Sequence, residues 1–245
     1  PFDNIQYDTS YGGSVYFDGA GDYLEVSQNT DFQLGTTGTI NFWMYVETLP
    51  GSMGVLLSGY NDANSISMYI HGQGDNFNIE WRDNFNNYYV LAGIPNTKNV
   101  WTYVSVVRTG TTLKTYFNGV ENGSVTVPAN SEFGTDMTFK IGSIYSSNYY
   151  KGYLSDYQII KGTAVVPTPS TIPTAPSSTH TNSKLHIKGT DASIIDKSQS
   201  DNLKILGNVV GASVAKFSNS FSTQFDGSGD YVRCEIEPIG TRDYT

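Results

Sequence analysis

The stretch Phe17-Asp18-Gly19-Ala20-Gly21-Asp22-Tyr23 decides the fold prediction, because it returns near the other end of the chain with a single change. The second copy reads Phe225-Asp226-Gly227-Ser228-Gly229-Asp230-Tyr231. Each copy places a glycine-rich turn between short runs of strand-forming residues, which is typical of a β-hairpin. A repeat this specific indicates two related modules in one chain.

The composition favours β-structure. The chain of 245 residues has 18 Tyr and 12 Phe, which suit half-buried sheet surfaces, and 25 Gly and 9 Pro, which mark frequent turns. Acidic residues outnumber basic ones by 23 to 14, and no basic cluster is present, so nucleic acid is not an expected partner. No apolar run approaches the roughly 20 residues that span a bilayer, so membrane insertion is not expected either.

Short apolar runs separated by turn residues fill the first two thirds of the chain and predict about a dozen strands of a two-sheet antiparallel sandwich. The pair Asn118-Gly119 supplies the two positive-φ positions of a tight hairpin turn. The predicted strands cover residues 15–17, 23–26, 39–46, 55–58, 65–70, 78–81, 88–92, 101–108, 112–117, 123–127, 137–141 and 152–160.

The domain organisation follows from a change in composition after Lys161. Residues 167–184 are rich in Pro, Ser and Thr and lack apolar content, which predicts a semi-rigid linker. The predicted domains are therefore a β-sandwich over residues 1–166 and a partial second repeat over residues 185–245. The second signature is preceded by a much longer stretch than the first, so the first sandwich is expected to lack its opening strand. We expect a strand from outside the first module, supplied by a neighbouring chain or by a segment beyond this sequence, to fill that edge.

The chain resembles the laminin-G-like domains of the concanavalin A-like jelly-roll superfamily, which occur in tandem in phage and other viral structural proteins and in secreted adhesins. Four stretches carry the resemblance: Phe17–Tyr23, Thr39–Val46, Trp101–Gly119 and Gly152–Gly162. It implies an all-β jelly roll of two antiparallel sheets, followed by a linker and the start of a second copy.

The resemblance also implies a Ca²⁺ site, formed by Asp18 and Asp22 of the glycine-rich turn and by Asp156 near the closing strand. Carboxylates and turn carbonyls are the oxygen ligands that Ca²⁺ prefers. The alternative is that Asp18 and Asp22 only cap their own turn.

Two loops combine aromatic and amide side chains, the mixture that sugar binding needs. They are residues 83–89 and 143–150, and together with residues 61–64 they are expected to line one surface. The alternative is that these aromatic residues pack within the sheets. The candidate ligand-binding residues are Asn61, Asp62, Trp81, Phe85, Tyr88, Tyr145 and Tyr149.

No catalytic residues are predicted. Glu80 and Asp83 are three positions apart on a predicted strand and therefore face opposite sides, unlike the carboxylates of jelly-roll glucanases. The three histidines, His71, His180 and His186, show no metal-ligand spacing and are interpreted as surface residues. Trp43 and Trp101 are interpreted as core residues because they lie in apolar runs.

These observations predict a non-catalytic structural or adhesive module of a virion or an extracellular surface. Its expected partners are other copies or neighbouring structural proteins of an assembly, and cell-surface glycans. Two alternatives stay open. One is the carbohydrate-binding domain of a larger secreted enzyme or cell-surface adhesin, and the other is a module that serves assembly alone.

Overall fold

The computed structural model describes residues 13–27, 30–48, 54–61, 65–73, 76–83, 87–95, 98–132, 138–143, 149–189, 194–196 and 203–206. Each of the twelve predicted strand regions forms a strand, and these are β1 to β12 in chain order. In the described residues the only helical element is η1 (Thr30–Phe32), and no helix is long or apolar enough to cross a membrane.

The first twelve strands are β1 (Val15–Asp18), β2 (Tyr23–Val26), β3 (Thr37–Thr48), β4 (Gly54–Asn61), β5 (Ser65–Gln73), β6 (Asn76–Arg82), β7 (Tyr88–Pro95), β8 (Trp101–Thr109), β9 (Thr112–Phe117), β10 (Val120–Thr126), β11 (Thr138–Ile141) and β12 (Lys151–Lys161). Three further strands follow: β13 (Ser183–Gly189), β14 (Ile194–Asp196) and β15 (Leu203–Leu206).

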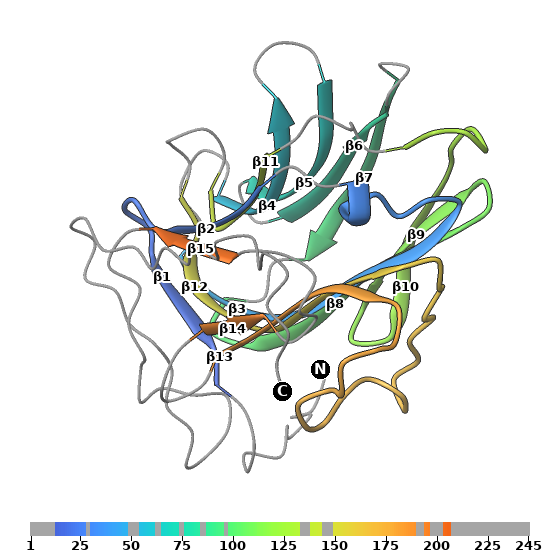
Figure 1. Ribbon diagram of the computed structural model, residues 1–245. Helices are drawn as coiled ribbons and strands as arrows, with labels where there is room; N and C mark the ends of the chain where they lie inside the picture. The colour runs from blue at the N-terminus through green and yellow to red at the C-terminus, as the bar shows by residue number, and fades with distance from the viewer. Residues whose placement is uncertain are drawn as a thin grey trace, which may run out of the picture.

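The described strands form two antiparallel sheets (Figure 1). Sheet A has the order β10-β9-β8-β3-β12-β13-β14, with β1 also paired to β12. Sheet B has the order β15-β2-β11-β4-β5-β6-β7. The predicted two-sheet antiparallel sandwich is therefore confirmed. The predicted hairpin turn is confirmed as well, since Asn118 and Gly119 have φ angles of 48° and 78°.

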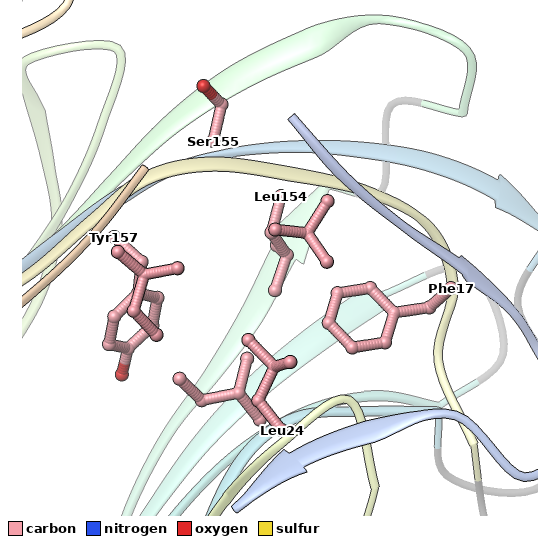
Figure 2. Close-up of a pocket in the computed structure, with 8 residues that line it drawn as sticks. Phe17, Leu24, Leu154, Ser155 and Tyr157 are labelled. Carbon is pink, nitrogen blue, oxygen red and sulfur yellow. The ribbon is translucent and has the colours of Figure 1, made fainter. Parts of the chain in front are cut away.

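The core lies between the sheets because alternate residues of each strand point inward. Phe17, Leu24, Phe42, Leu154 and Tyr157 are buried there. Figure 2 shows Phe17 of β1, Leu24 of β2 and Leu154 of β12 around a small, mainly apolar space. The side chain of Ser155 points away from the other labelled side chains in this view. The signature Phe17 thus anchors the hairpin β1–β2 in the centre of the sandwich.

Residues 183–206 add strands to the first sandwich. In sheet A, β13 pairs with the second half of β12, and in sheet B, β15 pairs with β2. Strands from outside residues 1–161 therefore pair with one side of each sheet, at β12 in sheet A and at β2 in sheet B. Both strands come from the same chain. This corrects the assignment of residues 185–206 to a second repeat. The second signature, Phe225 to Tyr231, lies outside the described residues, so a second module over the remaining residues stays a prediction.

A bulge in β12 lies between the part of the strand that pairs with β1 and the part that pairs with β13. Between Ser155 and Gln158, β12 has one residue more than the segment of β3 that it pairs with. Asp156, within this bulge, has a φ of 54°. On the other side of β12, β1 pairs with Leu154 and β13 pairs with Tyr157. Because a bulge bends the strand and re-aims its side chains, it lets one long strand serve two neighbours.

The segment 163–182, which we call the strap, packs on the outer face of sheet A instead of forming a free linker. Ile172 is 5% exposed and packs against Trp43 and Tyr103. The Thr39 hydroxyl donates a hydrogen bond to the Thr163 carbonyl, 3.0 Å away. In Figure 1 the strap runs from β12 to β13 in yellow and orange. The linker interpretation of residues 167–184 was wrong because the apolar and polar partners on this face of sheet A come together only in the folded chain.

Candidate functional site

The turn between β1 and β2 is held by its own two aspartates. The Ala20 amide donates to Asp18 Oδ1 at 2.6 Å, and the Asp18 amide donates to Asp22 Oδ2 at 3.2 Å. Gly19 and Gly21 have φ angles of 86° and 99°, which other residues rarely adopt. Both carboxylates therefore cap the turn, as the alternative interpretation of the signature expected.

Asp156 does not join these two carboxylates. In the register of β1 and β12, Asp18 is opposite Lys151, and Asp156 lies five positions farther along, about 16 Å at the usual rise of a strand. Among the described residues, no three His, Cys, Asp or Glu side chains are grouped in a way that could hold a metal ion. The three residues predicted for Ca²⁺ therefore do not fit one metal site, because the second half of β12 carries Asp156 away from the turn.

Asp156 instead organises a buried polar cluster between β12, β13 and the strap. Its Oδ1 accepts a hydrogen bond from His186 Nε2 at 2.7 Å, and its Oδ2 accepts from both the amide and the hydroxyl of Ser177, at 2.7 and 2.6 Å. The other ring nitrogen, His186 Nδ1, lies 2.8 Å from Thr179 Oγ1 and 3.1 Å from Gln158 Nε2.

This cluster contradicts the interpretation of His186 as a surface residue, because its side chain is fully buried. The sequence held no signal for it, since Asp156 and His186 are thirty residues apart and no motif links them. Their pairing depends on the register of β12 and β13. The cluster holds the strap on the sheet, and we interpret it as a structural element.

Two of the three predicted binding segments meet at one end of sheet B. Asn61 at the end of β4 pairs with Ser65 at the start of β5, and Arg82 near the end of β6 pairs with Tyr88 at the start of β7. Because β5 and β6 are neighbours in the sheet, the two hairpins end side by side, at the top of Figure 1. We call this end of the sheet the rim.

The described side chains of the rim include an exposed aromatic ring beside a fixed turn. Tyr88 is 54% exposed, and Asn87 before it is also exposed. Asp83 is buried and accepts hydrogen bonds from the Asn87 amide at 2.9 Å and from Asn87 Nδ2 at 3.1 Å. The Tyr89 hydroxyl adds a third contact to Asp83 at 3.4 Å. Asp83 therefore shapes the turn from below, and Tyr88 is presented outward.

The remaining predicted ligand residues are distributed as follows. Trp81 lies in β6, opposite Met68 of β5 and Tyr89 of β7. Asp62, Phe85 and Tyr145 lie outside the described residues. Their participation in a binding surface stays a prediction.

Tyr149 lies at the opposite end of sheet B from the rim. The Tyr150 amide donates to the carbonyl of Gly142, which follows β11, and β11 ends beside the start of β2. From β2 to β7 the sheet spans five strand spacings, about 24 Å. Tyr149 and Tyr88 therefore cannot line one compact surface, which corrects the expectation that the loops 83–89 and 143–150 act together.

The two tryptophans interpreted as core residues differ. Trp43 is 1% exposed, but it lies beneath Ile172 of the strap and outside the main core between the sheets. Trp101 is only half-buried. Both residues belong to the outer face of sheet A, and the sequence could not distinguish this face from the inner one because both carry apolar side chains.

A two-sheet antiparallel sandwich with aromatic and amide side chains at the end of one sheet has the architecture of lectin-like binding modules. The chain belongs to the concanavalin A-like lectin/glucanases superfamily, whose family model matches residues 18–166. The matched region begins at Asp18 of the signature and ends just after β12. A search of curated proteins finds no match.

Solved structures with similar folds are distant in sequence. A putative carbohydrate binding protein from Bacteroides ovatus has a TM-score of 0.58 at 13% identity, over 92% of this chain and 60% of that one. The receptor binding domain of botulinum neurotoxin D has a TM-score of 0.53 at 15% identity, over 92% and 64%. A heptameric SAP-like pentraxin from Limulus polyphemus has 0.51 at 16% identity, over 82% and 95%. At these identities the likeness concerns the fold alone.

Proposed function

We propose that this chain is a non-catalytic adhesion module that binds glycans at the rim of sheet B. The observation that carries the proposal is the side-by-side position of the two hairpin ends, one of which presents the exposed side chains of Asn87 and Tyr88. An aromatic face suits the apolar side of a sugar ring, and amides suit its hydroxyl groups.

The fixed turn supports this proposal. Asp83 holds the backbone and the side chain of Asn87 from below, so little conformational freedom remains to be lost when a ligand binds there. The similarity of the fold to a structure described as a putative carbohydrate binding protein is consistent with this function. It does not identify a sugar.

The wider setting that we propose is the surface of a virion or another extracellular surface, where the module contacts other copies or neighbouring structural proteins. The repeated signature, Phe17 to Tyr23 and Phe225 to Tyr231, supports an array of related modules. The alternative is the carbohydrate-binding domain of a larger secreted enzyme or cell-surface adhesin, which the parent gene would reveal by a catalytic domain.

The test is a glycan array with the whole chain, followed by titration of the best ligand with two variants. Tyr88→Ala should weaken binding about fivefold or more, which corresponds to about 1 kcal/mol. Tyr149→Ala, at the opposite end of the sheet, should change the affinity less than twofold. A clean negative array would favour a role in assembly alone, and equal effects of the two variants would contradict the position of the site.

A further inference from the structure

The outer face of sheet A carries four aromatic residues in one straight line across four neighbouring strands. In the strand register, Tyr16 of β1 is opposite Tyr153 of β12, Tyr153 is opposite Tyr45 of β3, and Tyr45 is opposite Trp101 of β8. We call these four residues the aromatic row. It spans three strand spacings, about 14 Å.

The rings of the row touch one another in sequence. The centroids of Tyr16 and Tyr153 are 4.7 Å apart, those of Tyr153 and Tyr45 are 5.7 Å apart, and those of Tyr45 and Trp101 are 5.6 Å apart. These are the distances of favourable aromatic pairs. The row is therefore a continuous and mutually supported strip.

The row lies on the face away from the core. The neighbours of Tyr16 and Tyr45 along their strands, Val15, Phe17, Met44 and Val46, are all buried in the core between the sheets. Because successive side chains of a strand alternate, Tyr16 and Tyr45 point to the other side. Tyr16, Tyr45 and Trp101 are only half-buried, whereas Tyr153 between them is 8% exposed.

The next aromatic pair on the same face is covered by the strap, unlike the row. Trp43 and Tyr103 have ring centroids 5.3 Å apart, and Ile172 of the strap packs against them. They are 1% and 5% exposed. The strap thus buries this pair almost completely, whereas three rings of the aromatic row keep accessible surface.

A carboxylate is fixed at the Tyr16 end of the row. Glu47 lies two residues beyond Tyr45 on β3, and its Oε2 accepts a hydrogen bond from the Tyr16 hydroxyl at 3.3 Å. The strip therefore combines exposed aromatic surface with phenolic hydroxyls and an acceptor-only group.

We propose that the aromatic row with Glu47 is a second ligand site, which binds a neutral oligosaccharide. Sugar rings stack along the strip, and Glu47 accepts hydrogen bonds from their hydroxyl groups. The length of the row, about three strand spacings, favours a chain of several sugars over a single one. The Glu47 carboxylate and the net charge of -9 disfavour sulfated or sialylated glycans. This site is on the opposite sheet from the rim and does not depend on the function proposed there.

The test is calorimetric titration of the whole chain with maltohexaose, cellohexaose and N-acetylchitohexaose, and with a heparin hexasaccharide as the charged comparison. We expect at least one neutral hexasaccharide to bind more tightly than its monosaccharide and more tightly than heparin. Trp101→Ala should weaken that binding at least tenfold and Glu47→Gln about threefold or more. Val166→Ala, which trims an exposed apolar side chain of the strap outside both proposed sites, is the control and should leave it unchanged.

Nuclear Overhauser contacts between the bound sugar and the Trp101 ring in the wild-type chain give a readout that does not depend on the folding of a variant. Absence of binding to all three neutral sugars, or tighter binding of heparin, would overturn the proposal. Loss of binding in Tyr88→Ala with no loss in Trp101→Ala would also overturn it, and would leave the function proposed for the rim intact. Binding of a protein partner to the aromatic row that none of the sugars displaces would count against the proposal as well.

Discussion

The Asp156 carboxylate and the His186 imidazole are joined by a buried hydrogen bond of 2.7 Å. This contact ties the closing strand of the family-matched region to a strand that follows the strap. Together with the two hydrogen bonds from Ser177, it makes Asp156 the centre of a cluster that fastens β12, β13 and the strap to one another.

The hydroxyl of Ser177 should stabilise the docked strap. Ser177→Ala removes its 2.6 Å hydrogen bond to Asp156 and should lower the free energy of unfolding by about 1.5 kcal/mol, the value typical of a hydrogen bond to a charged group. Urea denaturation measures this change, and limited proteolysis of residues 163–182 should become faster. Ser178→Ala, one residue farther along at an exposed position, is the control and should have little effect. Equal stability of the two variants would contradict the role of the cluster.

Two fully buried tyrosines should respond in opposite ways to loss of the hydroxyl. Tyr157 has no hydrogen-bond partner for its hydroxyl in the described part of the chain, whereas the Tyr150 hydroxyl donates to the Tyr45 carbonyl at 2.8 Å. Tyr157→Phe should raise the free energy of unfolding by about 1 kcal/mol, and Tyr150→Phe should lower it by about 1 kcal/mol. Chemical denaturation of the two variants decides this. A destabilised Tyr157→Phe would show that its hydroxyl has a partner after all.

The turn between β9 and β10 should be needed for docking of the strap. Gly119 and Gly110 both have left-handed φ angles, 78° and 59°, so Ala at either position costs about 1–2 kcal/mol of backbone strain. A Cβ at Gly119 would also lie 2.2 Å from the Thr168 backbone of the strap, whereas a Cβ at Gly110 would meet nothing within 4 Å.

We therefore expect Gly119→Ala to lower the free energy of unfolding more than Gly110→Ala does, by about 1–3 kcal/mol. Only Gly119→Ala should make the strap more sensitive to protease. Thermal unfolding and proteolysis of the two variants provide the comparison, and identical behaviour would mean that the strap does not rest on this turn.

The Tyr16 hydroxyl should titrate at unusually high pH. Burial, and next the Glu47 charge, raise the pKa of Tyr16 to about 12 from its usual value near 10. Because the unfolded chain releases this proton more readily, stability is fully present below pH 10 or so and is lost as pH rises through about 12. Glu47→Gln should move the pKa of Tyr16 towards its usual value. NMR titration of the tyrosine rings, with Tyr16→Phe for assignment, measures it, and an unchanged pKa would contradict the contact with Glu47.

Much of the fold could be predicted from local patterns. The signature Phe17 to Tyr23, the alternation of apolar residues and the Asn118-Gly119 turn each act over a few residues, so the sequence reveals them directly. The turns after β4 and β6 are predicted for the same reason, whereas their meeting at the rim depends on the pairing of β5 with β6. Tyr149 was grouped with them wrongly, because position in the chain does not say which end of a sheet a loop occupies.

The sequence by itself determined the strands, their turns and the all-β class, because these depend on side chains close together in the chain. Only the tertiary structure decided which strands share a sheet and which faces are covered. It placed residues 183–206 within the first sandwich, laid the strap over Trp43 and brought Asp156 to His186. The aromatic row has the same origin, since Tyr16, Tyr45, Trp101 and Tyr153 come together only through the register of four strands. Such pairings depend on the packing of the whole sandwich, which no short segment encodes.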